Sequence, residues 1–498
     1  MDSSGLMGRK SVDDILESGE GEHQLSKSLG ALSITAMGIG AIIGAGIFVL
    51  TGTAAAQYAG PGIMLSFVLG GIACAFVGLC YSEMAALIPV AGSSYTYTYA
   101  TLGEFFAWLI GWDLILEYAM GAATVAVGWS GYVTSILKDV GIAIPAQFAH
   151  APGTPIDGDG TALFNLPAVL IVALITLLLM RGTKESARFN NIMVAVKLTV
   201  VALFVGFGAF SLDPAHWHPF LPPNYGAFGH FGASGVLRGA SVVFFAFIGF
   251  DAVSTAAGEA KRPQRDMPIG ILGSLVLCTL LYVLFSHVLS GVASVQDFRT
   301  AGKEASVAFA IQKYMTGYGW LANFVTVAIL AGFSSVILVM LLGQSRVFYT
   351  MSRDGLVPPV FSELHPRFRT PWKSNVVFFF ATALFAGFLP DSIVGEMTSI
   401  GTLFAFILVC AGVWILRRRR PDLPRAFRAP AVPAIATLGI LVCAAMIFGL
   451  GWETWVRLVV WLLIGFIIYF GYGRRHSLLQ RGITNIPLGQ PEPTIVGD

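Results

Sequence analysis

Residues 38–48 read GIGAIIGAGIF and place four glycines, Gly38, Gly40, Gly44 and Gly46, in an apolar stretch long enough to cross a bilayer. Glycine is a poor helix former. In hydrocarbon, interrupted backbone persists only where it is buried in protein or lines a cavity, because every backbone polar group needs a partner. The cluster therefore has two interpretations. Either small residues let helices pack closely, or the helix is broken and its free amides and carbonyls bind a ligand.

Composition indicates the solvent of the chain. Of its 498 residues, 55% are hydrophobic and 12% are charged, whereas soluble domains carry about 25% charged residues. Such a chain cannot cover a surface that faces water, so we expect a bilayer, with membrane lipid as a partner. The net charge of +2 gives no argument for nucleic acid, and none is expected. All five cysteines fall in apolar segments, which is typical of packing residues rather than a disulfide set.

Twelve apolar segments approach the length of about 20 residues that a membrane helix needs. In order, these spans 1 to 12 cover residues 30–58, 61–88, 104–137, 164–181, 187–210, 235–258, 268–293, 319–349, 374–390, 394–417, 431–450 and 453–473. With the N-terminus inside, 23 of the 30 Lys and Arg residues fall in cytoplasmic segments and four fall outside. This split follows the positive-inside rule. We predict an all-α integral membrane protein of the cell (plasma) membrane, with twelve transmembrane helices and both termini cytoplasmic.

A second segment resembles the first. Residues 244–258, FFAFIGFDAVSTAAG, carry Gly249 in mid-span followed by small residues, as residues 43–56, IGAGIFVLTGTAAA, do. The two lie in spans 1 and 6, and five spans reverse the direction of insertion. Paired interruptions at matching positions of two inverted halves indicate the central site of a secondary transporter. This pairing favours broken helices over close packing.

The same residues carry a family resemblance. Four motifs resemble the amino acid–polyamine–organocation (APC) superfamily: GIGAIIGAGIF (38–48), YSEMAALIPVAGSSYTY (81–97), FFAFIGFD (244–251) and RDGLVPP (353–359). KESARFNN (184–191) and the overall layout are most similar to the cationic amino acid transporter (CAT) family, in a bacterial-type form with twelve spans.

The resemblance implies a leucine-transporter-type 5+5 inverted repeat with discontinuous helices 1 and 6, and import of L-amino acids. The chain would then divide into a cytoplasmic N-terminal tail (1–29), a first five-span repeat (30–213), an inverted second repeat (235–418), spans 11 and 12 (431–473) and a cytoplasmic C-terminal tail (474–498).

Broken helices could bind a zwitterion through backbone alone. The half-helix after the break in span 1 points its N-terminus at the centre, where free amides and the positive dipole end bind a carboxylate. Carbonyls that end the preceding half, and the first half of span 6, suit an ammonium group. The predicted substrate-binding residues are Gly44, Ala45 and Gly46 for the carboxylate and Ile42, Ile43, Phe245, Ala246 and Ile248 for the ammonium, with Phe245 and Phe250 as lining or plain packing side chains.

Lys197 is the candidate for ion coupling. A charged side chain at the bilayer centre costs about 2.5–3.5 kcal/mol on insertion scales. Lys197 follows Arg188 by nine residues, or about 13 Å of helix, which is too deep for easy snorkelling to the surface. Burial disfavours the ammonium form, so this side chain could gain and lose a proton. The resemblance implies that Lys197 takes the place of a sodium ion and contacts the backbone near Gly40, with the proton as coupling ion and sodium not expected.

Three further residues are specificity candidates. Asp113 and Glu117 are four residues apart and share a face of span 3. Glu117 and Asp251 could face a basic substrate side chain, although an acid at a helix start, as Asp251 is, also simply complements the dipole. Met340 in span 8 could limit the length of the substrate side chain or serve as packing. Near the end of span 8, Arg346 could take part in an ionic lock.

These features favour a secondary active transporter that imports neutral and/or cationic L-amino acids by alternating access, with proton symport. An amino acid/polyamine exchanger is the alternative, and a membrane amino acid sensor or a membrane-embedded enzyme is a weaker one. No span carries a recognisable His/Glu metal motif or a histidine paired with a nucleophile, so neither enzyme activity, a cofactor nor a metal is expected. An accessory single-span subunit is left open.

Overall fold

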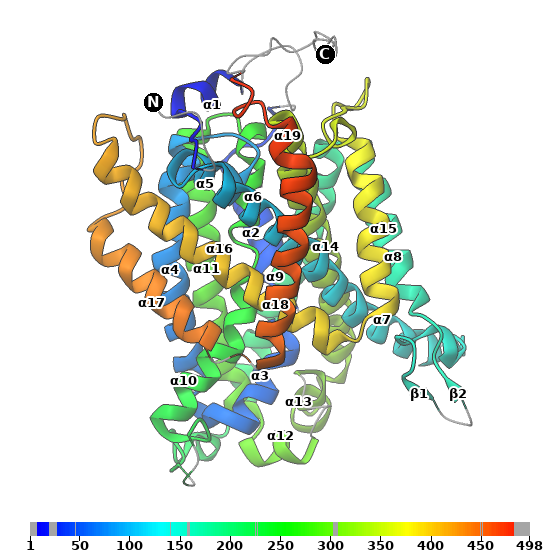
Figure 1. Ribbon diagram of the computed structural model, residues 1–498. Helices are drawn as coiled ribbons and strands as arrows, with labels where there is room; N and C mark the ends of the chain where they lie inside the picture. Colours follow the sequence, from blue (N-terminus) through cyan, green and yellow to red (C-terminus); the bar gives the residue numbers. More distant parts are fainter. Residues whose placement is uncertain are drawn as a thin grey trace.

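The computed structural model describes residues 7–18, 27–44, 46–139, 141–156, 160–224, 226, 228–301, 307–448, 450 and 452–482 (Figure 1). Over these ranges the chain forms a helical bundle. Its helices are α1 (Val12–Ser18), α2 (Ala31–Ile42), α3 (Thr51–Ala54), α4 (Ile63–Leu87), α5 (Ser93–Thr101), α6 (Glu104–Ile115), α7 (Gly121–Asp139), α8 (Leu166–Arg181), α9 (Thr183–Gly208), α10 (Gly232–Val243), α11 (Pro263–Val292), α12 (Val295–Ala301), α13 (Val307–Tyr314), α14 (Gly319–Arg353), α15 (Trp372–Phe388), α16 (Asp391–Arg419), α17 (Val432–Phe448), α18 (Trp452–Ile468) and α19 (Arg474–His476). The strands β1 (Pro155–Ile156) and β2 (Gly160–Thr161) pair antiparallel as a small hairpin.

Eight helical stretches of the described chain are long and apolar enough to cross a membrane. They cover Thr51–Leu87, Glu104–Lys138, Thr183–Ser211, Gly232–Glu259, Pro263–Val292, Gly319–Arg353, Glu396–Arg419 and Trp452–His476. Four shorter apolar helices, α2, α8, α15 and α17, accompany them. Their length and composition indicate a multi-pass membrane protein.

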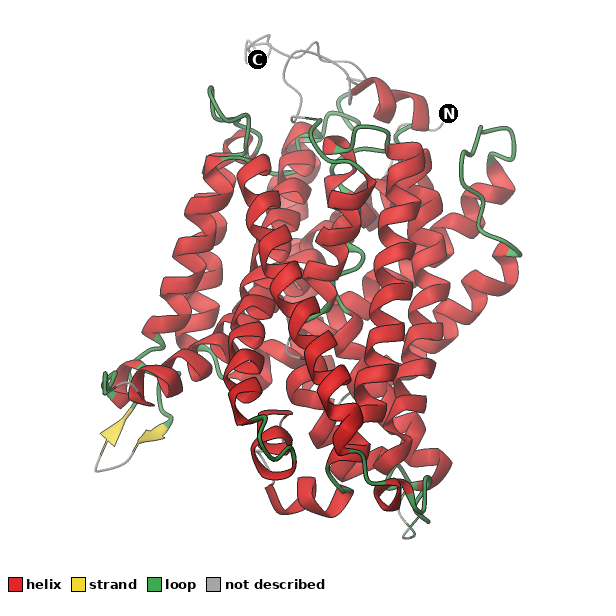
Figure 2. Ribbon diagram, turned by 180° about the vertical axis from the view of Figure 1, so that it is seen from behind, coloured by secondary structure: helices red, strands yellow, loops and turns green. Residues whose placement is uncertain are grey.

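The bundle has two distinct ends. Helices α1 and α19 lie at one end, and the β-hairpin, α12 and α13 lie at the other (Figure 1; Figure 2 gives the view from behind). We call them the α1/α19 end and the α12/α13 end. Large apolar side chains such as Leu441, Phe448 and Ile467 are exposed on α17 and α18. Such exposure would be costly in water but suits a surface that faces lipid.

Buried carboxylates hold the α1/α19 end together. Glu83 on α4 accepts two hydrogen bonds from Arg417 of α16, at 2.7 and 2.6 Å, and one from the Ala429 amide at 2.9 Å. Glu104, the first residue of α6, accepts a hydrogen bond from the hydroxyl of Tyr469 at 2.9 Å. Each acid is paired, as a buried polar group requires, and each joins segments that are far apart in sequence.

Candidate functional site

The helix that begins at Ala31 is interrupted at its glycine cluster. It ends at Ile42, Ile43 adopts an extended conformation (φ −77°, ψ 95°), and a wide helical turn begins at Gly46. Gly44 has no room for a side chain, since a Cβ there would lie 2.9 Å from a valine methyl group of α14. The predicted carboxylate ligand Ala45 lies outside the described residues.

A second interruption follows α10. The helix ends at Val243, a tighter turn covers Phe244–Phe247, and a second tight helical segment covers Ala252–Glu259. Between them Gly249 has φ +113°, a conformation that favours glycine. A Cβ on Gly249 would lie 2.9 Å from the Cβ of Ala41 on α2. The chain therefore breaks at this glycine, beside the end of α2.

The two interruptions are in contact with one another. Gly46 packs so closely against Ala246 that a Cβ at position 46 would collide with that alanine. From α11, the buried hydroxyl of Tyr282 lies 2.8 Å from the Ile42 carbonyl oxygen and 2.9 Å from that of Ala246, and it can donate to either. Tyr282 thus joins the ends of both broken helices.

The carbonyl groups predicted to bind an ammonium are mostly engaged within the protein. Those of Ile42 and Ala246 face Tyr282, as described above. The Ile43 carbonyl accepts from Lys197, and the Phe245 carbonyl accepts from the Ile248 amide at 3.3 Å. A carbonyl oxygen has two lone pairs, so these groups keep the capacity for a further donor.

Lys197 on α9 lies beside the first interruption with 0% of its surface exposed. Its Nζ donates to the carbonyl oxygens of Gly40 at 2.9 Å and Ile43 at 2.7 Å, and to Ser335 Oγ of α14 at 2.8 Å. The two carbonyls belong to the last turn of α2 and its cap, where a helix leaves acceptors unsatisfied and favours a cation. All three partners are neutral. The coupling role of Lys197 stays a prediction.

A group of unpaired acids lies next to the second interruption. Asp113, Glu117 and Asp251 are each 0% exposed. Glu117 and Asp251 are in electrostatic contact, and Tyr118 donates to Asp251 Oδ2 at 3.0 Å. Within the described part of the chain, neither oxygen of Asp113 or Glu117 accepts a well-aligned hydrogen bond, and Asp251 Oδ1 accepts none, although Thr402 of α16 lies beside Glu117. The structure therefore brings the two specificity candidates Glu117 and Asp251 together.

The remaining candidates line the same region. Met340 is buried on α14 and faces α7, where a Cβ on Gly121 would lie 3.8 Å from its sulfur. The ring of Phe250 is buried and lies 5.2 Å from that of Phe406 on α16. Phe245 is partly buried against the core. Met340 thus packs against Gly121, which follows Glu117 by four residues, and Phe250 belongs to an aromatic cluster.

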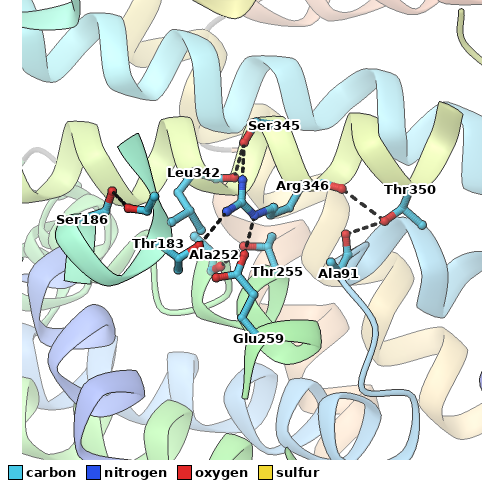
Figure 3. Close-up of polar contacts among 11 residues, drawn as sticks. Ala91, Thr183, Ser186, Ala252, Thr255, Glu259, Leu342, Ser345, Arg346 and Thr350 are labelled. Atoms are coloured by element: carbon cyan, nitrogen blue, oxygen red, sulfur yellow. Dashed lines mark hydrogen bonds and ion pairs between the residues drawn. The ribbon is translucent and has the colours of Figure 1, made fainter. Parts of the chain in front are cut away.

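A buried ion pair joins Arg346 to Glu259 near the second interruption (Figure 3). Arg346 on α14 is 1% exposed and Glu259, at the end of the second tight segment, is 0% exposed. Arg346 Nε lies 2.6 Å from Glu259 Oε1, and its terminal nitrogens donate to Ser345 Oγ at 3.1 Å and Thr183 Oγ1 at 3.4 Å. The pair joins α14 to the interrupted segment and to the first residue of α9.

A model of the amino acid permease family matches residues 29–471 of the chain. The chain belongs to this family. The match covers both interruptions, Lys197 and the acidic group. Membership in a permease family is consistent with a transporter and not an enzyme, and it agrees with the APC resemblance of the sequence motifs.

Individual relatives are similar over nearly the whole permease. A branched-chain amino acid permease of Bacillus subtilis is 48% identical over 473 residues, which cover 95% of this chain and 98% of the relative. A methylthioribose transporter of the same organism is 40% identical over 473 residues, with 95% and 99% coverage. The vacuolar cationic amino acid transporter 4 of Arabidopsis thaliana is 30% identical over 597 residues, with 96% and 97% coverage.

Sequence reasoning missed three residues of this permease. Tyr282 is a lone tyrosine in the apolar run CTLLYVLF (278–285), and Ser335 is one of two serines in GFSSVILVM (332–340). A polar side chain within such a run is the signal that could have found each of them, because it needs a partner at that depth. Glu259 gave no signal, because an acid at the end of an apolar segment reads as a surface residue.

Proposed function

We propose that this permease is a secondary active transporter that imports L-amino acids across the cell membrane by alternating access, in symport with protons. The observation that carries the proposal is the placement of Lys197. Its ammonium faces three neutral oxygens at the break in α2, on two other helices. A proton gained or lost here acts directly on the interrupted segment.

We further propose twelve spans in a 5+5 inverted repeat, with both termini in the cytoplasm. Eight long and four shorter apolar helices support the number. An even number also agrees with α1 and α19 at one end of the bundle, which we assign to the cytoplasm. Contact between the interruptions of the first and sixth spans supports the repeat, because matched breaks at a central site are typical of such transporters.

The substrate would bind between the two interruptions. Its carboxylate would face the amides of Gly44 to Gly46, at the start of the resumed helix. Its ammonium would share the carbonyls of Ile42 and Ala246, which now face the hydroxyl of Tyr282. The substrate side chain would extend toward Met340. Relatives named for branched-chain and for cationic amino acids support neutral and/or cationic substrates.

The coupling of proton and substrate movement follows from the number of hydrogen-bond donors on Lys197. A protonated lysine has three N–H donors and no acceptor, and three oxygens surround Lys197 Nζ. A neutral amine keeps two donors and gains a lone pair, so one oxygen would lose its donor. Loss of the proton to the cytoplasm would therefore loosen the end of α2 and favour release of the substrate. No sodium ion or other cofactor is needed in this scheme.

Uptake into liposomes tests the proposal. Purified permease should accumulate labelled leucine or alanine when an inward proton gradient is imposed, in buffers without sodium. Equal uptake with and without the gradient would contradict proton symport. Uptake that appears only when amino acid or polyamine is loaded inside would indicate an exchanger, and binding without flux would indicate a sensor.

A further inference from the structure

The three acids beside the second interruption, Asp113, Glu117 and Asp251, form what we call the acidic cluster. It differs from the other buried acids described above. Glu259 is paired with Arg346 and Glu83 is paired with Arg417. Within the described ranges, no member of the acidic cluster forms an ion pair, and only one of their six carboxylate oxygens accepts a well-aligned hydrogen bond, from Tyr118.

Hydroxyl groups around the cluster are unsatisfied as well. Tyr81 of α4 is fully buried beside Ser94, and its hydroxyl makes no well-aligned hydrogen bond in the described chain, although it is in electrostatic contact with both Asp251 and Glu117. Tyr97 of α5, which faces Asp251 and lies beside Ser254, is also buried, and its hydroxyl makes no well-aligned hydrogen bond to the residues that the structure describes. Buried polar atoms are normally bonded to protein or water. Several weakly bonded polar groups around one point indicate a place where a polar ligand can bind.

The charges of the surrounding groups indicate what class of ligand fits there. The groups that face Glu117 are Asp251, Asp113, the neutral Thr402 of α16 and the phenols of Tyr81 and Tyr118. Those that face Asp251 are Glu117, the phenols of Tyr118, Tyr81 and Tyr97, and the Cys74 thiol. None is a cation. Two neighbouring carboxylates in a medium of low dielectric constant do not both ionise, and such a pair holds a shared proton.

We propose that Glu117 and Asp251 share one proton while the bound amino acid has a neutral side chain, and that a basic side chain displaces this proton and takes its place. The inference rests on the proposed function. The exchange is balanced: one cationic side chain enters, one proton leaves to solvent, and the charge of the site is unchanged. The proton on Lys197 takes no part in this exchange, because Lys197 contacts neither acid.

A basic ligand then competes with a proton and a neutral ligand does not. Lysine and norleucine are a matched pair, since they share a backbone and a linear side chain and differ in the terminal ammonium. We expect the affinity for lysine relative to norleucine to rise by up to about tenfold per pH unit while the pair is protonated. Lys197 acts on the part of the site that binds the ligand's backbone, which lysine and norleucine share, so its effect on affinity cancels in this ratio. Lysine binding should also release about one proton, and norleucine binding should release none from this pair.

The test is calorimetric binding of both amino acids to the purified full-length permease, in buffers of different ionisation enthalpy and from acid to neutral pH. Glu117→Gln and Asp251→Asn should each remove the pH dependence of the lysine-to-norleucine affinity ratio, and each should weaken the binding of lysine more than that of norleucine. A pH-independent ratio with no proton release in the wild type would overturn the inference, whether or not the variants fold. Norleucine binding without lysine binding at any pH would also overturn it and leave amino acid transport intact. Failure of every amino acid to bind would overturn the proposed function itself.

Discussion

Two buried cations, Lys197 beside α14 and Arg346 on it, are compensated in different ways. Lys197 faces two backbone carbonyls and the hydroxyl of Ser335, whereas Arg346 faces the carboxylate of Glu259. Ser335 and Arg346 are eleven residues apart on this helix, about 16 Å. A guanidinium does not deprotonate in proteins, but a buried lysine does. The contrast separates a fixed charge that fastens helices together from a charge that can change during transport.

The largest effect should follow from removal of the changeable charge. Lys197→Met should retain amino acid binding but lose all gradient-driven accumulation, because no proton can then move with the substrate. Lys184→Met, at an exposed position on the same helix, is the matched control and should accumulate substrate normally. Unimpaired accumulation by Lys197→Met in liposomes would show that Lys197 is not the coupling group.

Removal of the fixed charge should affect stability. Arg346→Ala leaves Glu259 buried without a partner, and loss of one member of a buried pair costs about 3–5 kcal/mol. The double variant Arg346→Met/Glu259→Leu removes both charges and should recover most of that loss. Denaturant unfolding in detergent measures the difference. Equal stability of the single and double variants would mean that the pair does not behave as a compensated unit.

A backbone substitution compares an interruption with a regular helix. Gly249→Ala forces an alanine into φ +113° with its Cβ 2.9 Å from that of Ala41, and we expect a loss of about 1–3 kcal/mol together with weaker substrate binding. Gly206→Ala on α9, where a Cβ would meet nothing within 4 Å, should be neutral or stabilise by up to about 1 kcal/mol. Thermal unfolding and ligand titration check both. Similar results for the two variants would contradict the special role of the interruption.

The smallest effect concerns the hydroxyl that joins the two broken helices. Tyr282→Phe should destabilise the ligand-free permease by about 1 kcal/mol, the net value of a typical hydrogen bond. Substrate affinity should rise severalfold, because the substrate ammonium would no longer compete with the hydroxyl for the carbonyls of Ile42 and Ala246. A fall in affinity would instead identify the hydroxyl as a substrate ligand. Isothermal titration decides between these results.

Part of this arrangement could be predicted from sequence, because the structural role of some residues depends only on their own type and their position within a segment. Glycines at 44, 46 and 249 within apolar segments indicated where backbone is free, and the structure interrupts both segments there. The depth of Lys197 along its helix followed from the rise per residue alone. The contact between Lys197 and the backbone near Gly40 was implied by the family resemblance.

Other contacts could not be predicted, because a uniformly apolar run does not record how its helix is rotated. Tyr282 reaches a carbonyl 240 residues earlier in the chain, and Arg346 reaches an acid 87 residues earlier. Both pairings depend on how several helices pack. The Ile43 carbonyl was predicted as a substrate ligand, and its hydrogen bond with Lys197 could not be predicted for the same reason.

Proton movement measured during uptake tests proton coupling at Lys197 most directly. Permease in liposomes that contain a pH-sensitive dye is mixed with a neutral amino acid, without any imposed gradient. We predict that the interior acidifies as the amino acid enters, and that Lys197→Met, which still binds the amino acid, gives no acidification. Entry of amino acid with no change of interior pH in the wild type would contradict this mechanism.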